Sequence, residues 1–245
     1  MFSVEHRCVP SPSQLALAPA LACVLSVAAP VDAAQPGDCG AEPAISVSEV
    51  AGSRYKRFEG RICARGTPAQ LVQLFHLDNS FTDWLYRCEH AKTLTVLGAG
   101  HRIFYFRWDG PLFFPDQEIL AEAIMKRSAD GESVRVSLTN VSAEDSRLFR
   151  LQIPRHRGSV RPRLLDAEWS FTKISARRLE IGYRLWLVPA GFAPSAAANA
   201  VTGTSVRKSL RDLKRTLESD RLDSIGTELL DSLPLAPDVP GRKEG

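Results

Sequence analysis

The stretch SAAANAVTGTSVRKSLRDLKRTL, residues 195–217, decides the fold that we predict for this chain. Its second half predicts an amphipathic helix, because large apolar residues recur on one helical face at Val206, Leu210, Leu213 and Leu217. Its first half carries small residues instead, namely Ala196, Ala197, Ala198, Ala200, Gly203 and Thr204. Small side chains let a helix approach a sheet closely, or they leave room beside it. The segment therefore predicts one long helix that covers an apolar surface.

Strand patterns precede this helix along most of the chain. Residues 55–65 alternate between apolar and polar positions, which indicates a half-buried strand. Residue types and turn signals predict further strands at 92–97, 102–108, 117–127, 133–141, 164–174 and 178–188. After the first strand, Thr67 suits a helix N-cap and Pro68 suits the first helical position, so a short helix should follow. Residues 142–160 are polar and irregular.

This order of elements predicts an α+β fold of the helix-grip type. The apolar concave face of a twisted antiparallel sheet has to be covered, and the C-terminal helix is the only later element long enough to cover it. A single helix touches a curved sheet along a line. The space on either side is then filled by large side chains or left hollow, and the small residues of 196–204 favour a hollow. We therefore predict a curved antiparallel sheet around a long C-terminal helix, enclosing an apolar cavity.

The N-terminal residues predict export. A modest basic start, an apolar run over 15–30 and the small residues after it are typical of a secretory signal peptide over 1–34, cleaved after Ala33 or Ala34. A lipoprotein acylated at Cys23 and a leader that stays attached are the alternatives. We expect a periplasmic or secreted protein with three further parts: a loop-like lead-in at 35–52, the domain at 53–218 and a flexible tail at 219–245.

Charge and cysteine content exclude some classes of protein. The formal net charge of +3 is too small to argue for nucleic acid binding, although it is compatible with weak attraction to an anionic surface. Removal of 1–34 leaves Cys39, Cys63 and Cys88, whose spacing fits no zinc site. A Cys63–Cys88 disulfide and two buried free thiols are the alternatives for that pair. Histidine spacing shows no metal pattern either, so we predict no metal and no cofactor.

Several local motifs, in their order along the chain, resemble the START (steroidogenic-acute-regulatory-related lipid transfer) domain family, in particular its bacterial exported members. The motifs are YKRFEG at 55–60, WLYRC at 84–88, GPLFFPDQE at 110–118, RPRL at 161–164 before Glu168-Trp169, PAGFAP at 189–194 and LRDL at 210–213. Two departures occur within them: Gln117-Glu118 replaces a usual Arg-Asp pair, and only Gly191 remains of a usual glycine pair.

The resemblance covers roughly residues 50–218, and it has consequences for fold and function. It implies a START-like, or Bet v 1-like, helix grip. It also implies binding of a sterol, a phospholipid or another apolar ligand. Transfer of that ligand between membranes would involve movement of the final helix or of a neighbouring loop.

Candidate ligand-binding residues are large aromatic side chains and members of the small-residue half of the last helix. We predict a cavity lined by Trp84, Phe104, Phe106, Phe113, Phe114, Arg135, Trp169, Tyr183, Ala197 and Val201. Tyr105 and Trp186 are further aromatic candidates, while Arg107 and Arg184 are alternatives to Arg135 for an inward-facing guanidinium. An inward arginine would need a partner, because a lone buried charge is costly. Alternation alone does not decide which strand face is concave.

Three functions fit these observations. No nucleophile elbow, Ser-x-x-Lys motif or phosphate-binding loop occurs in the sequence, so we predict no catalytic residues. The leading hypothesis is a protein that binds a lipid or other hydrophobic small molecule, either holding it only or also transferring it between membranes. The alternative is a helix-grip enzyme of the polyketide aromatase or cyclase kind, and the third is a structural or partner-binding protein with a filled core. We expect a monomer that contacts membranes transiently.

Overall fold

The computed structural model describes residues 39–111, 114–154, 156–191, 193–219 and 226–236. All of them belong to the unit Gln35–Gly245. The signal peptide predicted at 1–34, the acylation site considered at Cys23 and the cavity candidate Phe113 lie outside the described residues. Within the described ranges, no helix combines the length and the apolar character needed to cross a membrane.

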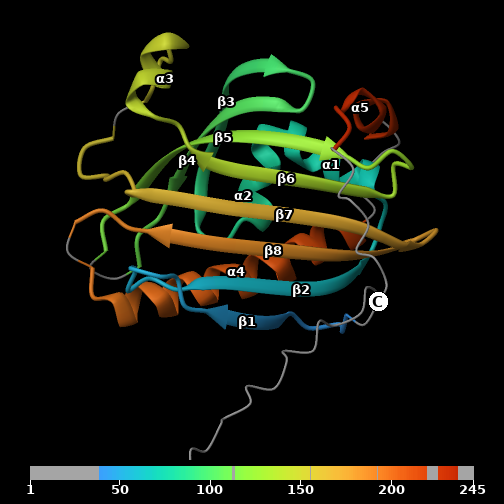
Figure 1. The fold of residues 1–245 in the computed structure, drawn as a ribbon, viewed down its shortest axis with the longest axis horizontal. Coiled ribbons are helices and arrows are strands. Elements are labelled where there is room, and N and C mark those ends of the chain that lie inside the picture. The colour runs from blue at the N-terminus through green and yellow to red at the C-terminus, as the bar shows by residue number, and fades with distance from the viewer. Residues whose placement is uncertain (1–38, 112–113, 155, 192, 220–225, 237–245) are drawn as a thin grey trace, which may run out of the picture. The chain divides into compact units, whose positions relative to one another are not determined.

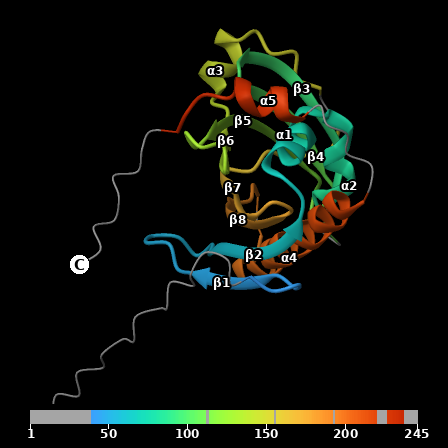
Figure 2. The ribbon, with the colours of Figure 1, turned by 90° about the vertical axis from the view of Figure 1, so that its right-hand side faces the viewer.

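Eight antiparallel strands form one sheet in the order β1-β2-β8-β7-β6-β5-β4-β3 (Figure 1). The strands are β1 (Ala44–Ser48), β2 (Arg57–Arg65), β3 (Cys88–Gly98), β4 (His101–Trp108), β5 (Gln117–Arg127), β6 (Ser133–Asn140), β7 (Leu164–Ser175) and β8 (Arg178–Val188). Figure 2 shows the sheet curving around the helices on its inner side. The seven predicted strands are confirmed, with differences only at their ends.

Strand β1 corrects the prediction of a loop-like lead-in at 35–52. It pairs with β2, and Ile45 lies opposite Gly60. Because Gly60 has no side chain, Ile45 Cδ1 comes within 2.8 Å of the position that a β-carbon would take there. Ile45 therefore packs against the core from the edge of the sheet. That contact depends on a glycine in another strand, which the short AISVS pattern does not reveal.

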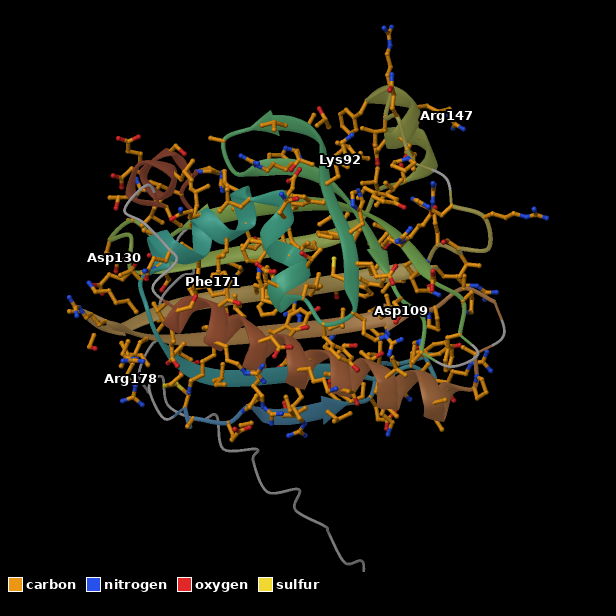
Figure 3. The ribbon with its side chains drawn as sticks, turned by 180° about the vertical axis from the view of Figure 1, so that it is seen from behind. Lys92, Asp109, Asp130, Arg147, Phe171 and Arg178 are labelled. Atoms are coloured by element: carbon orange, nitrogen blue, oxygen red, sulfur yellow. A yellow bond between two sulfur atoms is a disulfide. The ribbon has the colours of Figure 1, made fainter. Side chains whose placement is uncertain are left out.

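Helices α1 (Pro68–His76), α2 (Phe81–Trp84) and α4 (Ser195–Glu218) cover the concave face together (Figure 3). A short 3₁₀ turn, η1 (Asp78–Ser80), joins the first two. The predicted start of α1 is confirmed. The backbone N–H of Gln70 donates to Thr67 Oγ1 at 3.3 Å, and the backbone N–H of Thr67 donates to Gln70 Oε1 at 2.9 Å. The long C-terminal helix is confirmed as α4, but α1 and α2 share the face that it was expected to cover alone.

The small residues of α4 bring it close to β2. A β-carbon on Gly203 would lie 2.8 Å from Phe58 Cε1, and one on Gly60 would lie 2.9 Å from Val206 Cγ1. Such distances are shorter than real carbon contacts, so each glycine is required by the close approach of helix and strand. Close approach is therefore one purpose of the small residues that the sequence analysis identified.

The disulfide joins Cys39 to Cys63, and Cys88 is a buried free thiol. The Cys63–Cys88 alternative is therefore wrong, and so is the alternative of two free thiols. Cys63 pairs with Glu180 in the register of β2 and β8 and lies on the outer face, whereas Ile62 and Cys88 belong to the core. Side chains alternate between the two faces of a strand. The backbone N–H of Cys63 also donates to the Gly40 carbonyl at 3.1 Å, so a hydrogen bond next to the disulfide further attaches the segment at Cys39 to β2.

The chain after α4 returns to the fold, so the prediction of a flexible tail is wrong for 226–236. Helix α5 (Gly226–Ser232) packs against α1, and Leu233 is 3% exposed. The Arg127 N–H donates to the Pro234 carbonyl at 3.0 Å, and the Ala236 N–H donates to the Arg127 carbonyl at 2.7 Å. A strand-like bridge to the end of β5 therefore holds this segment. The remaining helix is α3 (Ala143–Leu148), within the stretch expected to be irregular.

Candidate functional site

Aromatic side chains fill most of the space between the concave sheet face and the helices. Trp169 on β7 and Tyr183 on β8 stack with their ring centroids 3.7 Å apart. Phe81 of α2 meets Phe104 and Phe106 of β4 edge to face, at 5.2 and 5.1 Å between centroids. The full cluster is Phe75, Phe81, Trp84, Phe104, Phe106, Trp169, Phe171 and Tyr183, all at most 4% exposed. Five predicted cavity residues are thus brought together: Trp84, Phe104, Phe106, Trp169 and Tyr183.

Two small apolar cavities remain in this space. The inner one, of about 20 Å³, lies among the aromatic rings of α1, α2, β4, β7 and β8. The outer one, of about 70 Å³, lies between the first half of α4, the end of β8 and the segment 108–117. Trp108 belongs to both linings. The two cavities are therefore neighbours that share Trp108 as a wall, and together they are called the chamber here; residues of α4 line the outer one.

The enclosed space is apolar, as predicted, but it is small. Ligand sites for small molecules usually exceed about 300 Å³, against about 70 Å³ for the outer cavity. Residues of the short helices, Phe75, Phe81 and Trp84, occupy the volume that a single gripping helix would leave free. Larger depressions of about 580 and 490 Å³ lie outside the aromatic cluster, at the C-terminal end of α4 and on the outer face of β5–β7.

Among the remaining candidates, the structure separates lining residues from others. Phe114 and Val201 line the outer cavity. Ala197 does not belong to the described lining, whereas its neighbour Ala198 does. The expectation that Arg135 faces the cavity is wrong. Its side chain is 60% exposed on the outer face, 3.6 Å from the Glu168 carboxylate. Arg135 alternates with Val134 and Val136, whose side chains enter the core.

The other candidates that were weighed also lie on the outer face. Arg107 pairs with Glu89 at 2.9 Å, and Arg184 lies 3.6 Å from Glu168. Trp186 follows Arg184 by two positions and shares its face. Arg107 and Arg184 therefore stand on the side of the sheet opposite the chamber, whereas Trp186 packs at the end of the sheet against the cluster of Tyr55, Ala193 and Ala198.

Tyr105 and Glu118 form a buried polar contact on the outer face. The Tyr105 hydroxyl donates to Glu118 Oε1 at 3.3 Å, and the His156 backbone N–H donates to the same oxygen at 2.8 Å. Burial, and then the Glu118 charge, raise the pKa of Tyr105 to about 12. Glu118 stands in the Gln117-Glu118 departure noted in the sequence. Its role here is to attach the segment around His156 to the sheet.

Polar groups of the chamber are few. Trp84 Nε1, Trp108 Nε1 and Gln117 Oε1 are buried, and among the described residues they have no hydrogen-bond partner. At the rim, Arg87 Nε donates to the Asp109 carbonyl at 2.8 Å, and its guanidinium also pairs with the Asp109 carboxylate. Arg87 has a left-handed backbone with φ of 61°, a conformation that costs a non-glycine residue energy.

Several known proteins and solved structures are similar to this chain. No family model matches the chain. An uncharacterized protein of Pseudomonas aeruginosa, PA1579, is 24% identical over 174 residues, which are 71% of this chain and 81% of that protein. The structure of a STAR-related lipid transfer protein from Xanthomonas axonopodis matches with a TM-score of 0.63 and 18% identity, over 75% of this chain and 98% of that one.

Human structures match in the same way. The human StAR-related lipid transfer protein 5 gives a TM-score of 0.61 at 11% identity, over 77% of this chain and 88% of that one. Human STARD10 gives 0.60 at 13% identity, over 73% and 70%. The chain has the START fold. The resemblance read from the local motifs is therefore confirmed at the level of architecture: the START fold accounts for the curved sheet and for α4.

Sequence reasoning missed several residues that line the chamber in this START fold: Tyr86, Arg87, Trp108, Asp109, Gln117, Ala198 and Thr202. A signal for Trp108 was present, because alternation along β4 puts it on the same face as Phe104 and Phe106. Arg87 and Asp109 carried no such signal. They lie 22 positions apart and meet only because β3 and β4 pair at Cys88 and Trp108.

Proposed function

We propose that this chain binds a hydrophobic small molecule between the concave sheet face and α4 without changing it chemically. The observation that carries this proposal is the mainly apolar lining of two neighbouring cavities that share Trp108, the outer of which lies against the small-residue half of α4. Solved proteins of the same fold, from Xanthomonas axonopodis and human, are named for lipid transfer. A lipid is therefore the first class of ligand to test.

Binding requires the chamber to widen, because the two cavities together are smaller than a lipid. The first half of α4 is the part best suited to move. Its side chains are small, and its N-cap, Pro194, provides no side-chain hydrogen bond to the helix start. The second half is anchored by Val206, Leu210 and Leu213, each with no measurable exposure. Displacement of residues 195–205 would open the outer cavity and leave the anchor in place.

Transfer between membranes is the finer part of the proposal. The second half of α4 carries five cationic side chains on its outer surface: Arg207, Lys208, Arg211, Lys214 and Arg215. Anionic partners of this set are Glu42, 2.7 Å from Arg211, and Asp212, 3.0 Å from Arg215. A cationic helix attracts anionic lipid head groups. A periplasmic or secreted location belongs to the same proposal and rests on the export signal in the sequence.

A binding role is favoured over catalysis by the chemistry of the described lining. Its ionised side chains are Arg87 and Asp109, which pair with each other at the rim. Tyr183 is buried, and burial raises the pKa of its phenol. Tyr86 also lines the outer cavity, and the hydrogen bond from Lys208 lowers the pKa of its phenol. Apart from Tyr86, no acid or base among the described lining residues is free to transfer protons near neutral pH.

One observation favours a second candidate, a partner-binding or structural protein with a filled core. The aromatic cluster leaves an inner cavity of only about 20 Å³. A chamber that never opens would make the START fold a rigid scaffold.

Extraction of the purified chain and native mass spectrometry separate the two candidates. Under the first proposal the protein carries apolar molecules from its source, and after delipidation it takes up lipid from vesicles. Repeated recovery of lipid-free protein, together with no uptake from vesicles of neutral or anionic composition, would exclude ligand binding and leave the second candidate.

A further inference from the structure

Three buried polar atoms of the chamber lack a hydrogen-bond partner among the described residues. Two are indole donors, Nε1 of Trp84, a residue that lines the inner cavity, and Nε1 of Trp108, a residue that lines both cavities. The third is an acceptor, Oε1 of Gln117, a residue that lines the outer cavity. Trp84 is 1% exposed. An unpaired buried polar group costs about 1–3 kcal/mol, so a bound molecule that pairs with these atoms gains affinity.

The charge of the chamber restricts that molecule further. The inner cavity has no ionised side chain in its described lining. The outer cavity has Arg87 and Asp109, which pair with each other and balance each other's charge. An ionised ligand group would lose its hydration without meeting a counter-charge, which is costly in an apolar site.

Resting on the proposed function, we infer that the ligand is a neutral, mainly apolar molecule carrying a hydroxyl or carbonyl oxygen to which Trp84 or Trp108 donates. Trp108 belongs to both linings, so its indole lies beside an oxygen held in either cavity. A hydroxyl at the mouth can also donate to Gln117 Oε1. The apolar body then contacts the aromatic cluster. Hydrocarbons leave the indole groups unpaired, and anionic lipids bring an unmatched charge.

Matched probes test this inference on the full chain. The first set is cholesterol, 5α-cholestane and cholesterol sulfate; the second is 1-hexadecanol, hexadecane and hexadecyl sulfate. Each is delivered from cyclodextrin and competes with the neutral dye Nile red. In at least one set, the alcohol should displace the dye at a concentration about tenfold below that needed for its hydrocarbon or its sulfate.

Indole-to-phenyl variants identify the donors. Trp84→Phe or Trp108→Phe should weaken binding of the alcohol about fivefold and leave the hydrocarbon nearly unchanged. Trp186→Phe is the matched control, because its Nε1 is also buried without a hydrogen-bond partner among the described residues, but Trp186 belongs to neither cavity lining. If a phenylalanine variant fails to fold, 3-benzothienylalanine at the same position keeps the bicyclic shape without the N–H.

The outcomes separate the inference from the proposed function. Tighter binding of the sulfates, or equal loss for alcohol and hydrocarbon in both indole variants, overturns the inference while ligand binding stands. Failure of all six probes to displace the dye, with no lipid recovered by extraction, overturns the proposed function itself.

Discussion

Trp169 and Tyr183 lie face to face, with ring centroids 3.7 Å apart and an interplanar angle of 6°. They are register partners on β7 and β8, and both line the inner cavity. Trp84 of α2 meets the same indole edge to face at 5.3 Å. The stack therefore connects the middle of the sheet to the short helices that fill the chamber.

Tyr183→Ala should destabilise the fold by about 3–5 kcal/mol, because it removes a buried aromatic ring and leaves a cavity. Tyr183→Phe keeps the ring and should cost less than about 1.5 kcal/mol. Urea unfolding followed by circular dichroism measures both values. Similar losses for the two variants would show that the hydroxyl, and not the stack, is what the fold requires.

Val201→Trp should block ligand uptake by filling the outer cavity that Val201 lines. We expect binding of Nile red at least tenfold weaker than in the parent, while Ala200→Trp, on the exposed side of α4, should bind normally. Fluorescence titration provides the measurement. Equal binding by all three proteins would place the ligand outside the chamber.

Cys39→Ser should destabilise the protein by about 2–4 kcal/mol through loss of the loop closed by Cys39 and Cys63, which are 24 positions apart. The edge strand β1 should then exchange its amide hydrogens faster. Thermal unfolding of the parent with a reducing agent is the control and should reproduce the variant. If the melting temperature of the parent did not change with the reducing agent, the Cys39–Cys63 disulfide would not be present in the folded protein.

His76→Gln should make the stability less dependent on pH. Burial lowers the pKa of His76 below its usual 6.5, and the ring Nδ1 donates to the Val72 carbonyl at 2.8 Å. Because the folded-state pKa lies below the unfolded one, the neutral ring favours folding above pH 6.5, and this contribution is lost as the pH falls through 6.5 towards the lower value. Urea midpoints of parent and variant should diverge between pH 8 and pH 5. If the urea midpoints of both proteins changed in parallel with pH, His76 would not contribute to the pH dependence of stability.

Leu233→Ala should cost about 2–5 kcal/mol, because the side chain is 3% exposed behind α1. Leu235→Ala, at 55% exposure, should change the stability by less than about 0.5 kcal/mol. Chemical unfolding distinguishes them. If neither substitution mattered, the segment 226–236 would not be part of the folded unit in solution.

Much of this fold was predictable from local patterns. The alternation along β2 and β8, the cap at Thr67 and the apolar stripe from Val206 to Leu217 all predicted the elements observed. The aromatic members of the chamber were also predictable, because they are the largest apolar side chains on those elements. Strand β1 and helix α5 were not, because they are short and owe their places to Gly60 and to α1.

Local sequence patterns did not predict the features of the chamber that depend on contacts between segments far apart in the sequence. The Arg87–Asp109 pair at the rim depends on the register of β3 and β4. The partner of Cys63 depends on which face of β2 it occupies, and the outward direction of Arg135 depends on which face is concave.

The sequence by itself determined the order of strands and helices and the amphipathic character of α4, because period and capping are local properties of the chain. Only the tertiary structure decided how much space is left in the chamber, since that volume is what remains between the curved sheet and the side chains of Phe75, Phe81 and Trp84 packed against it. It also decided that the Nε1 groups of Trp84 and Trp108 find no hydrogen-bond partner among the described residues, because hydrogen-bond partners are set by neighbours in space.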